Sequence, residues 1–137
     1  MFKHIAAVLA AVGLLSASGC STLADARAAK GSGEARVYTA SYDQVWDAVP
    51  AALKELGLKE EGYSKGSGYV VARSAPPMKN VITTPTLGDN VAIFVDKADA
   101  AGKTRVEVVS RGPLRLETFG TKWESKVLDK LSEKFPR

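Results

Sequence analysis

The chain has 137 residues, which is enough for one domain and hardly for two. It is 45% hydrophobic and 25% charged, with a formal net charge of +4. Charges of both signs are interspersed, so the sequence shows no basic motif of the kind that nucleic-acid-binding proteins use, and no nucleic-acid partner is predicted. The single cysteine, Cys20, and the single histidine, His4, both lie near the N-terminus.

Residues 1–19 have the pattern of an export signal. Lys3 precedes an apolar run from Ile5 to Leu15, and small residues then lead to Cys20. This is the order of a secretory signal peptide with its cleavage site. The run is shorter than the roughly 20 residues that a membrane-spanning helix needs. Removal of residues 1–19 is therefore predicted, and a buried core helix is the alternative.

The predicted cleavage lies between Gly19 and Cys20. The four residues that end at Cys20, Ala17-Ser18-Gly19-Cys20, resemble the bacterial lipobox, although leucine is usual at the position of Ala17. The resemblance implies a small bacterial lipoprotein with diacylglycerol on Cys20, and two or more acyl chains anchor a protein stably. Ser21 in place of aspartate resembles outer-membrane sorting in a Gram-negative host. The predicted location is the periplasmic face of the outer membrane, and a soluble secreted protein is the alternative.

Processing at Cys20 constrains the chemistry of the remaining chain. Once His4 is removed and Cys20 is acylated, no Ser-His-Asp or Cys-His nucleophile and no histidine-based metal site can be assembled. Glu60 and Glu61 are adjacent carboxylates, but neighbouring residues of a strand point to opposite faces. The sequence therefore predicts no catalytic residue, no metal and no cofactor, and a hydrolase that uses a carboxylate pair is the remaining alternative.

Residues 20–34 are predicted to be the lipidated cysteine and a flexible tether, and residues 35–137 a single α+β domain. A first strand is expected at 35–40, with Val37 as its apolar residue. Ser41 and Gln44 form an S-x-x-Q capping box, which predicts a helix that ends at Gly57. Pro50 lies inside this helix and predicts a bend.

Two strands at 58–64 and 68–74 are predicted to form a hairpin through Lys65-Gly66-Ser67. The segment 75–90 that follows is rich in proline, and long connections of this kind are often functional or disordered. One interpretation is a partner-binding loop, and the other is a short edge strand at 80–84. The loop would present four apolar side chains: Met78, Val81, Ile82 and Leu87.

A second hairpin is predicted from alternating strands at 91–95 and 105–110. The last helix is expected to begin at Thr121 through a T-x-x-E capping box with Glu124. Trp123, Val127, Leu131 and Phe135 form an apolar stripe along it. A basic stripe lies beside it and consists of Lys122, Lys126, Lys130 and Lys134. These lysines are predicted either to lie along the border of the core with solvated ammonium groups or to face a membrane.

These elements predict an α+β fold in the order β-α-β-β-β-β-α. About five antiparallel strands would carry two helices on one face. The stretch from Tyr38 to Trp46, followed by Leu56-Gly57, resembles small uncharacterised bacterial lipoproteins. The element order is similar to the helix-grip domains of an accessory lipoprotein of the outer-membrane assembly machinery. The resemblance implies a non-enzymatic role in the envelope.

The leading functional hypothesis is an interaction or accessory module that docks on another envelope protein through a sheet edge or the 75–90 loop. The alternative is a binder of a lipid or small amphiphile in a pocket between helix and sheet. Five aromatic residues could line such a pocket or simply form core: Trp46, Tyr63, Tyr69, Phe94 and Trp123.

Overall fold

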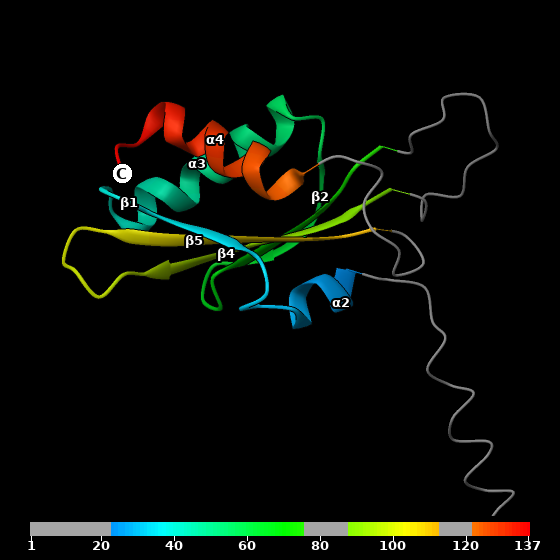
Figure 1. The fold of residues 1–137 in the computed structure, drawn as a ribbon, viewed down its shortest axis with the longest axis horizontal. Coiled ribbons are helices and arrows are strands. Elements are labelled where there is room, and N and C mark those ends of the chain that lie inside the picture. The colour runs from blue at the N-terminus through cyan, green and yellow to red at the C-terminus, as the bar shows by residue number, and fades with distance from the viewer. Residues whose placement is uncertain (1–22, 76–87, 113–121) are drawn as a thin grey trace, which may run out of the picture.

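The computed structural model describes residues 23–75, 88–112 and 122–137. In these ranges a twisted sheet carries helices on both faces (Figure 1). From the first strand onward the order of elements confirms the predicted α+β class. The elements are α2 (Leu23–Ala28), β1 (Glu34–Tyr38), α3 (Tyr42–Glu55), β2 (Lys59–Ser64), β3 (Tyr69–Arg73), β4 (Asn90–Lys97), β5 (Thr104–Arg111) and α4 (Trp123–Lys134).

The strands form one antiparallel sheet in the order β1-β5-β4-β3-β2. Both predicted hairpins are confirmed, since β2 pairs with β3 and β4 pairs with β5. The first strand returns to pair with the last, with Glu34 opposite Val108 and Tyr38 opposite Thr104. The two edges of the sheet are therefore β1 and β2.

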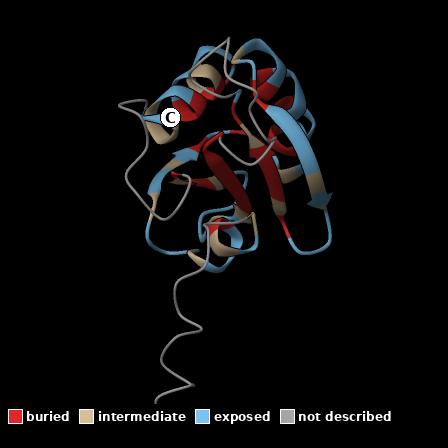
Figure 2. Cartoon of the chain, turned by 90° about the vertical axis from the view of Figure 1, so that its right-hand side faces the viewer, coloured by how far each residue is buried: buried red, intermediate tan, exposed pale blue. Residues whose placement is uncertain are grey.

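Helices α3 and α4 cover the same face of the sheet, as predicted (Figure 1). Their apolar sides meet alternate residues of the central strands, such as Ile93 of β4 and Val108 of β5. Figure 2 shows that the buried residues gather in these strands and on the helix sides turned toward them. Leu53 and Leu128 are almost fully buried, and burial of each such side chain contributes about 2–3 kcal/mol.

Helix α3 begins and ends as its sequence predicts. The Ser41 hydroxyl accepts a hydrogen bond from the Gln44 amide, and the Gln44 side chain accepts one from the Ser41 amide. Gly57 follows the C-cap with a φ of +74°, a conformation that glycine adopts at little cost. Pro50 lies inside the helix and is itself exposed.

Helix α4 has the predicted apolar stripe, but the predicted capping box is wrong. The helix begins after Lys122, which makes no side-chain cap hydrogen bond, and Thr121 lies outside the described residues. The Glu124 carboxylate instead accepts hydrogen bonds from the Ser110 amide and hydroxyl, at 2.9 and 2.7 Å. Glu124 thus ties the first turn of α4 to the end of β5.

Strand β1 is shorter than predicted, and its apolar residue Val37 is 41% exposed. Tyr38 supplies the buried anchor at the end of the strand. Its hydroxyl donates to the Leu128 carbonyl of α4 at 2.6 Å, and its ring meets Phe135 edge-on. The strand therefore turns Tyr38, not Val37, toward the helices.

The second face of the sheet carries helix α2, which the sequence did not predict. Ala26 is fully buried there against a small cluster that includes Phe94 and Val109. A flexible tether was predicted for residues 20–34, but from Leu23 onward the chain is packed on the domain.

A buried carboxylate holds the segment after α2 in place. Glu107, on β5, is 1% exposed and accepts hydrogen bonds from the amides of Gly31 and Gly33 at 2.7–3.0 Å. Arg105 lies 3.6 Å from the same carboxylate and balances its charge. Gly33 comes so close to β5 that a Cβ atom would lie 2.1 Å from the Val108 carbonyl oxygen. The loop Gly31-Ser32-Gly33 therefore holds the end of α2 on the sheet. A buried carboxylate requires hydrogen-bond donors, and the amides of Gly31 and Gly33 supply them.

Candidate binding surface

The described part of the chain does not assemble a metal centre, since no three acidic, histidine or cysteine side chains converge there. No helix within the described ranges is long and apolar enough to cross a bilayer. The adjacent carboxylates Glu60 and Glu61 are both exposed on β2, where a bulge shifts the pairing between Glu60 and Gly62.

The structure places the five predicted aromatic residues in three separate environments. Trp46 and Trp123 belong to the core beneath α3 and α4. Tyr69 and Phe94 pack against α2 on the opposite face. Tyr63 is 66% exposed on the edge strand β2. Because the sheet separates the first two groups, the five residues do not line one pocket. Trp46 and Tyr63 line one surface pocket together, whereas Tyr69 and Phe94 are cross-strand neighbours on the opposite face.

Trp46 and Tyr63 line a surface pocket of about 320 Å³, which we call the α3–β2 groove. The residues that line it are Trp46, Pro50, Glu60, Tyr63 and Val70. Pro50 follows Trp46 by one turn of α3, so both lie on the same side of the helix. The sequence reasoning missed the roles of Pro50 and Glu60. The four-residue spacing between Trp46 and Pro50 in a predicted helix was the sequence signal that could have placed Pro50 beside Trp46.

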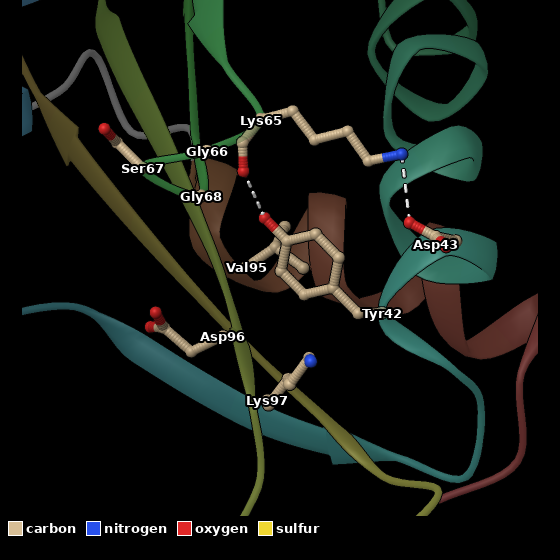
Figure 3. A pocket seen from close by; sticks show the side chains of 9 residues that line it. All are labelled: Tyr42, Asp43, Lys65, Gly66, Ser67, Gly68, Val95, Asp96 and Lys97. Atoms are coloured by element: carbon tan, nitrogen blue, oxygen red, sulfur yellow. Dashed lines mark hydrogen bonds and ion pairs between the residues drawn. The ribbon is translucent and has the colours of Figure 1, made fainter.

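A second pocket, of about 440 Å³, lies at the β2–β3 turn, and we call it the turn pocket (Figure 3). The Tyr42 hydroxyl donates to the Lys65 carbonyl at 2.7 Å, while the Lys65 ammonium pairs with Asp43 at 2.9 Å. Burial, and then the charge of Asp96, raise the pKa of Tyr42 above its usual value. Its hydroxyl therefore stays a hydrogen-bond donor that fastens the turn to the start of α3.

The Tyr42–Trp46 pair separates the two pockets. The two rings are stacked, with centroids 6.1 Å apart and planes 9° from parallel. Tyr42 lines the turn pocket and Trp46 lines the α3–β2 groove. Since Tyr42 is itself held by Lys65, the Trp46 wall of the groove is fixed before any ligand arrives, which lowers the entropic cost of binding.

The four predicted lysines do not form a uniform basic surface. Lys130 of α4 bridges to α3 by pairing with Glu55 at 3.2 Å, and it also pairs with Glu133 of its own helix at 3.4 Å. The hydrogen bond to Glu55 is the main cause of the raised pKa of Lys130. Lys126 and Lys134 lie over the rings of neighbouring aromatic residues, and Lys122 is exposed. Membrane contact by this stripe stays a prediction.

Trp123 has a structural role at one end of the sheet. Its indole nitrogen donates to the Asp89 carboxylate at 2.9 Å, and the Asp89 amide donates to the Ser74 hydroxyl at 2.8 Å. Asp89 is 4% exposed, and this burial raises the pKa of its carboxyl group. The remaining predicted site residues lie outside the described residues, namely Cys20, Met78, Val81, Ile82 and Leu87.

Comparison of the chain with protein-family models and with curated proteins gives no match.

Proposed function

We propose that the chain is a Gram-negative envelope lipoprotein, held at the periplasmic face of the outer membrane by acyl chains on Cys20. Its domain is a non-enzymatic module that docks on another envelope protein. The signal-like residues 1–19 and the lipobox-like residues 17–20 support the anchor. The absence of histidine after His4 supports binding rather than catalysis.

The observation that carries the docking function is that β2 is an edge strand among the described strands of the sheet. An edge strand has backbone N–H and C=O groups with no strand to pair on one side. Just after the other edge strand, β1, the chain is tied to the C-terminal segment, where the Thr39 amide donates to the Pro136 carbonyl at 2.7 Å. On β2, Tyr63 is 66% exposed beside the α3–β2 groove. Exposed tyrosine is enriched at protein interfaces.

The 75–90 loop is a second proposed contact through Met78, Val81, Ile82 and Leu87. A pull-down with intact and loop-deleted protein tests it, since recovery of the same partners by both proteins would remove the loop from the docking surface.

Photo-crosslinking in living cells tests the docking function. A photoreactive phenylalanine analogue replaces Tyr63 in the full-length chain, and the same analogue at the exposed Val37 of β1 is the control. We expect a discrete protein adduct from position 63, none from position 37, and loss of the adduct in a Cys20→Ala background. Equal adducts at both positions, or adducts to lipid alone, would contradict the docking function.

Binding of an amphiphile in the α3–β2 groove is the second candidate function. Its volume of about 320 Å³ is at the lower end of the range for ligand pockets, and Trp46 and Tyr63 give it apolar walls. A fatty acid that binds there should change tryptophan fluorescence, and Tyr63→Ala should abolish the change. An unaltered spectrum at saturating fatty acid would remove this candidate.

A further inference from the structure

We infer that the α3–β2 groove selects an extended polypeptide segment in which an apolar residue and a lysine or arginine are two positions apart. This inference rests on the proposed docking function and names the chemistry of the partner. The apolar side chain would enter the groove beside Tyr63, and the cation would lie at Glu60.

The two-residue spacing follows from the register of the β2–β3 hairpin. Tyr63 is opposite Val70 and Glu60 is opposite Ala72. Val70 and Ala72 both belong to the core beneath α3, so their partners point to that same face despite the bulge between them. A strand added along β2 presents every second side chain to one face, so residues i and i+2 of the partner would meet Tyr63 and Glu60.

The charge preference follows from two uncompensated carboxylates. In the described part of the chain several acidic groups have a cationic partner, as Asp43 has Lys65 and Glu55 has Lys130. Glu60 and Glu61 form no ion pair with any described residue, and both are exposed. Adjacent like charges on a sheet edge repel acidic segments and attract basic ones.

The apolar preference follows from the size and walls of the groove. A cavity of about 150 Å³ already admits benzene, so a pocket of about 320 Å³ accommodates an aliphatic or aromatic side chain. Trp46 is 8% exposed and already stacked on Tyr42, so this wall needs no rearrangement. Covering the exposed ring of Tyr63 would remove apolar surface from water.

The same features restrict binding to segments of the right sequence. Charged residues and bulges on an edge strand discourage indiscriminate pairing with other strands. Strand β2 carries Lys59, Glu60 and Glu61 together with the bulge before Gly62. Any pairing of two copies of β2 that places Glu60 and Glu61 opposite each other would be repulsive, which disfavours those registers for a second copy of this chain.

Fluorescence anisotropy with defined peptides tests the inference on the full-length chain. The probe is a fluorescein-labelled octapeptide, Ser-Val-Thr-Leu-Thr-Lys-Thr-Ser, and its matched control has glutamate in place of lysine. We expect the lysine peptide to bind about two- to fivefold more tightly, as for a partly exposed ion pair. Tyr63→Ala should weaken it about tenfold, as at an interface hot spot. Val37→Ala, on the other edge strand, should have no effect.

A charge-reversal cycle completes the test, because Glu60→Lys should invert the preference between the two peptides. Equal affinities for both peptides, or a preference that Glu60→Lys leaves unchanged, would overturn the inference. Failure of both peptides to bind at millimolar concentration would also overturn it. If the crosslink from position 63 to an envelope protein persists in that case, the docking function stands and only the stated partner chemistry fails.

Discussion

The Glu107 carboxylate should control whether helix α2 stays on the sheet. In Glu107→Ala the amides of Gly31 and Gly33 lose their acceptor. A hydrogen bond to a charged group contributes about 1.5–3 kcal/mol, so the loss of two costs about 3 kcal/mol or more. That corresponds to roughly a hundredfold rise in the population in which the 23–33 segment is open. The core beneath α3 and α4 lies on the other face and should be little affected.

Limited trypsin digestion and hydrogen exchange of the full-length chain measure this opening. Trypsin cleaves after Arg27 and Lys30, both of which are exposed in or just after α2. We expect faster cleavage there and loss of exchange protection in 23–33, with protection of α3 retained. Glu60→Ala removes an exposed carboxylate and is the control. Unaltered protection of 23–33, or equal loss in α3, would refute the assigned role of Glu107.

Three further predictions concern stability, each measured by urea denaturation. Gly33→Ala should cost about 1–3 kcal/mol because its Cβ would meet the Val108 carbonyl, whereas Gly66→Ala, which has open space around it, should be neutral; equal effects would contradict the close approach. The pKa of Asp89 is raised from about 3.8, so the folded state holds a proton that the unfolded state releases, and stability should fall as pH rises above that value. Asp89→Asn should remove this part of the pH dependence, and an unchanged profile would count against it. Leu128→Ala should cost about 2–5 kcal/mol, since the side chain is fully buried, and a cost below 1 kcal/mol would contradict its place in the core.

The elements that local patterns specify could be predicted from the sequence. The Ser41–Gln44 capping box and Gly57 give both ends of α3, because the groups involved are within a few residues of each other. The alternating strands of both hairpins are also local signals, which the structure confirms. The return of β1 to β5 brings together residues about 70 positions apart, such as Glu34 and Val108, and no local pattern specifies it.

The features that sequence reasoning missed depend on contacts between distant segments. Helix α2 has a single fully buried residue, Ala26, and its docking depends on Glu107, 76 positions from Gly31. Glu124 fits a capping-box pattern, yet Ser110 competes successfully for its carboxylate. For the candidate groove, the sequence suggested Tyr63 as a pocket-lining aromatic residue. It could not show that β2 is an edge strand or that Tyr63 is exposed there, because both depend on the order of the strands in the sheet.

Docking of α2 limits how far the domain can reach from the bilayer. Under the proposed anchoring on Cys20, only Ser21 and Thr22 separate the acyl chains from the first residue of α2. Three residues span at most about 10 Å. A flexible tether of 14 residues would have an end-to-end distance on the order of 20 Å. The domain would therefore diffuse laterally within a thin layer at the membrane surface. A partner segment confined to the same layer would encounter it at a raised effective concentration, so even a weak intrinsic affinity could sustain the complex.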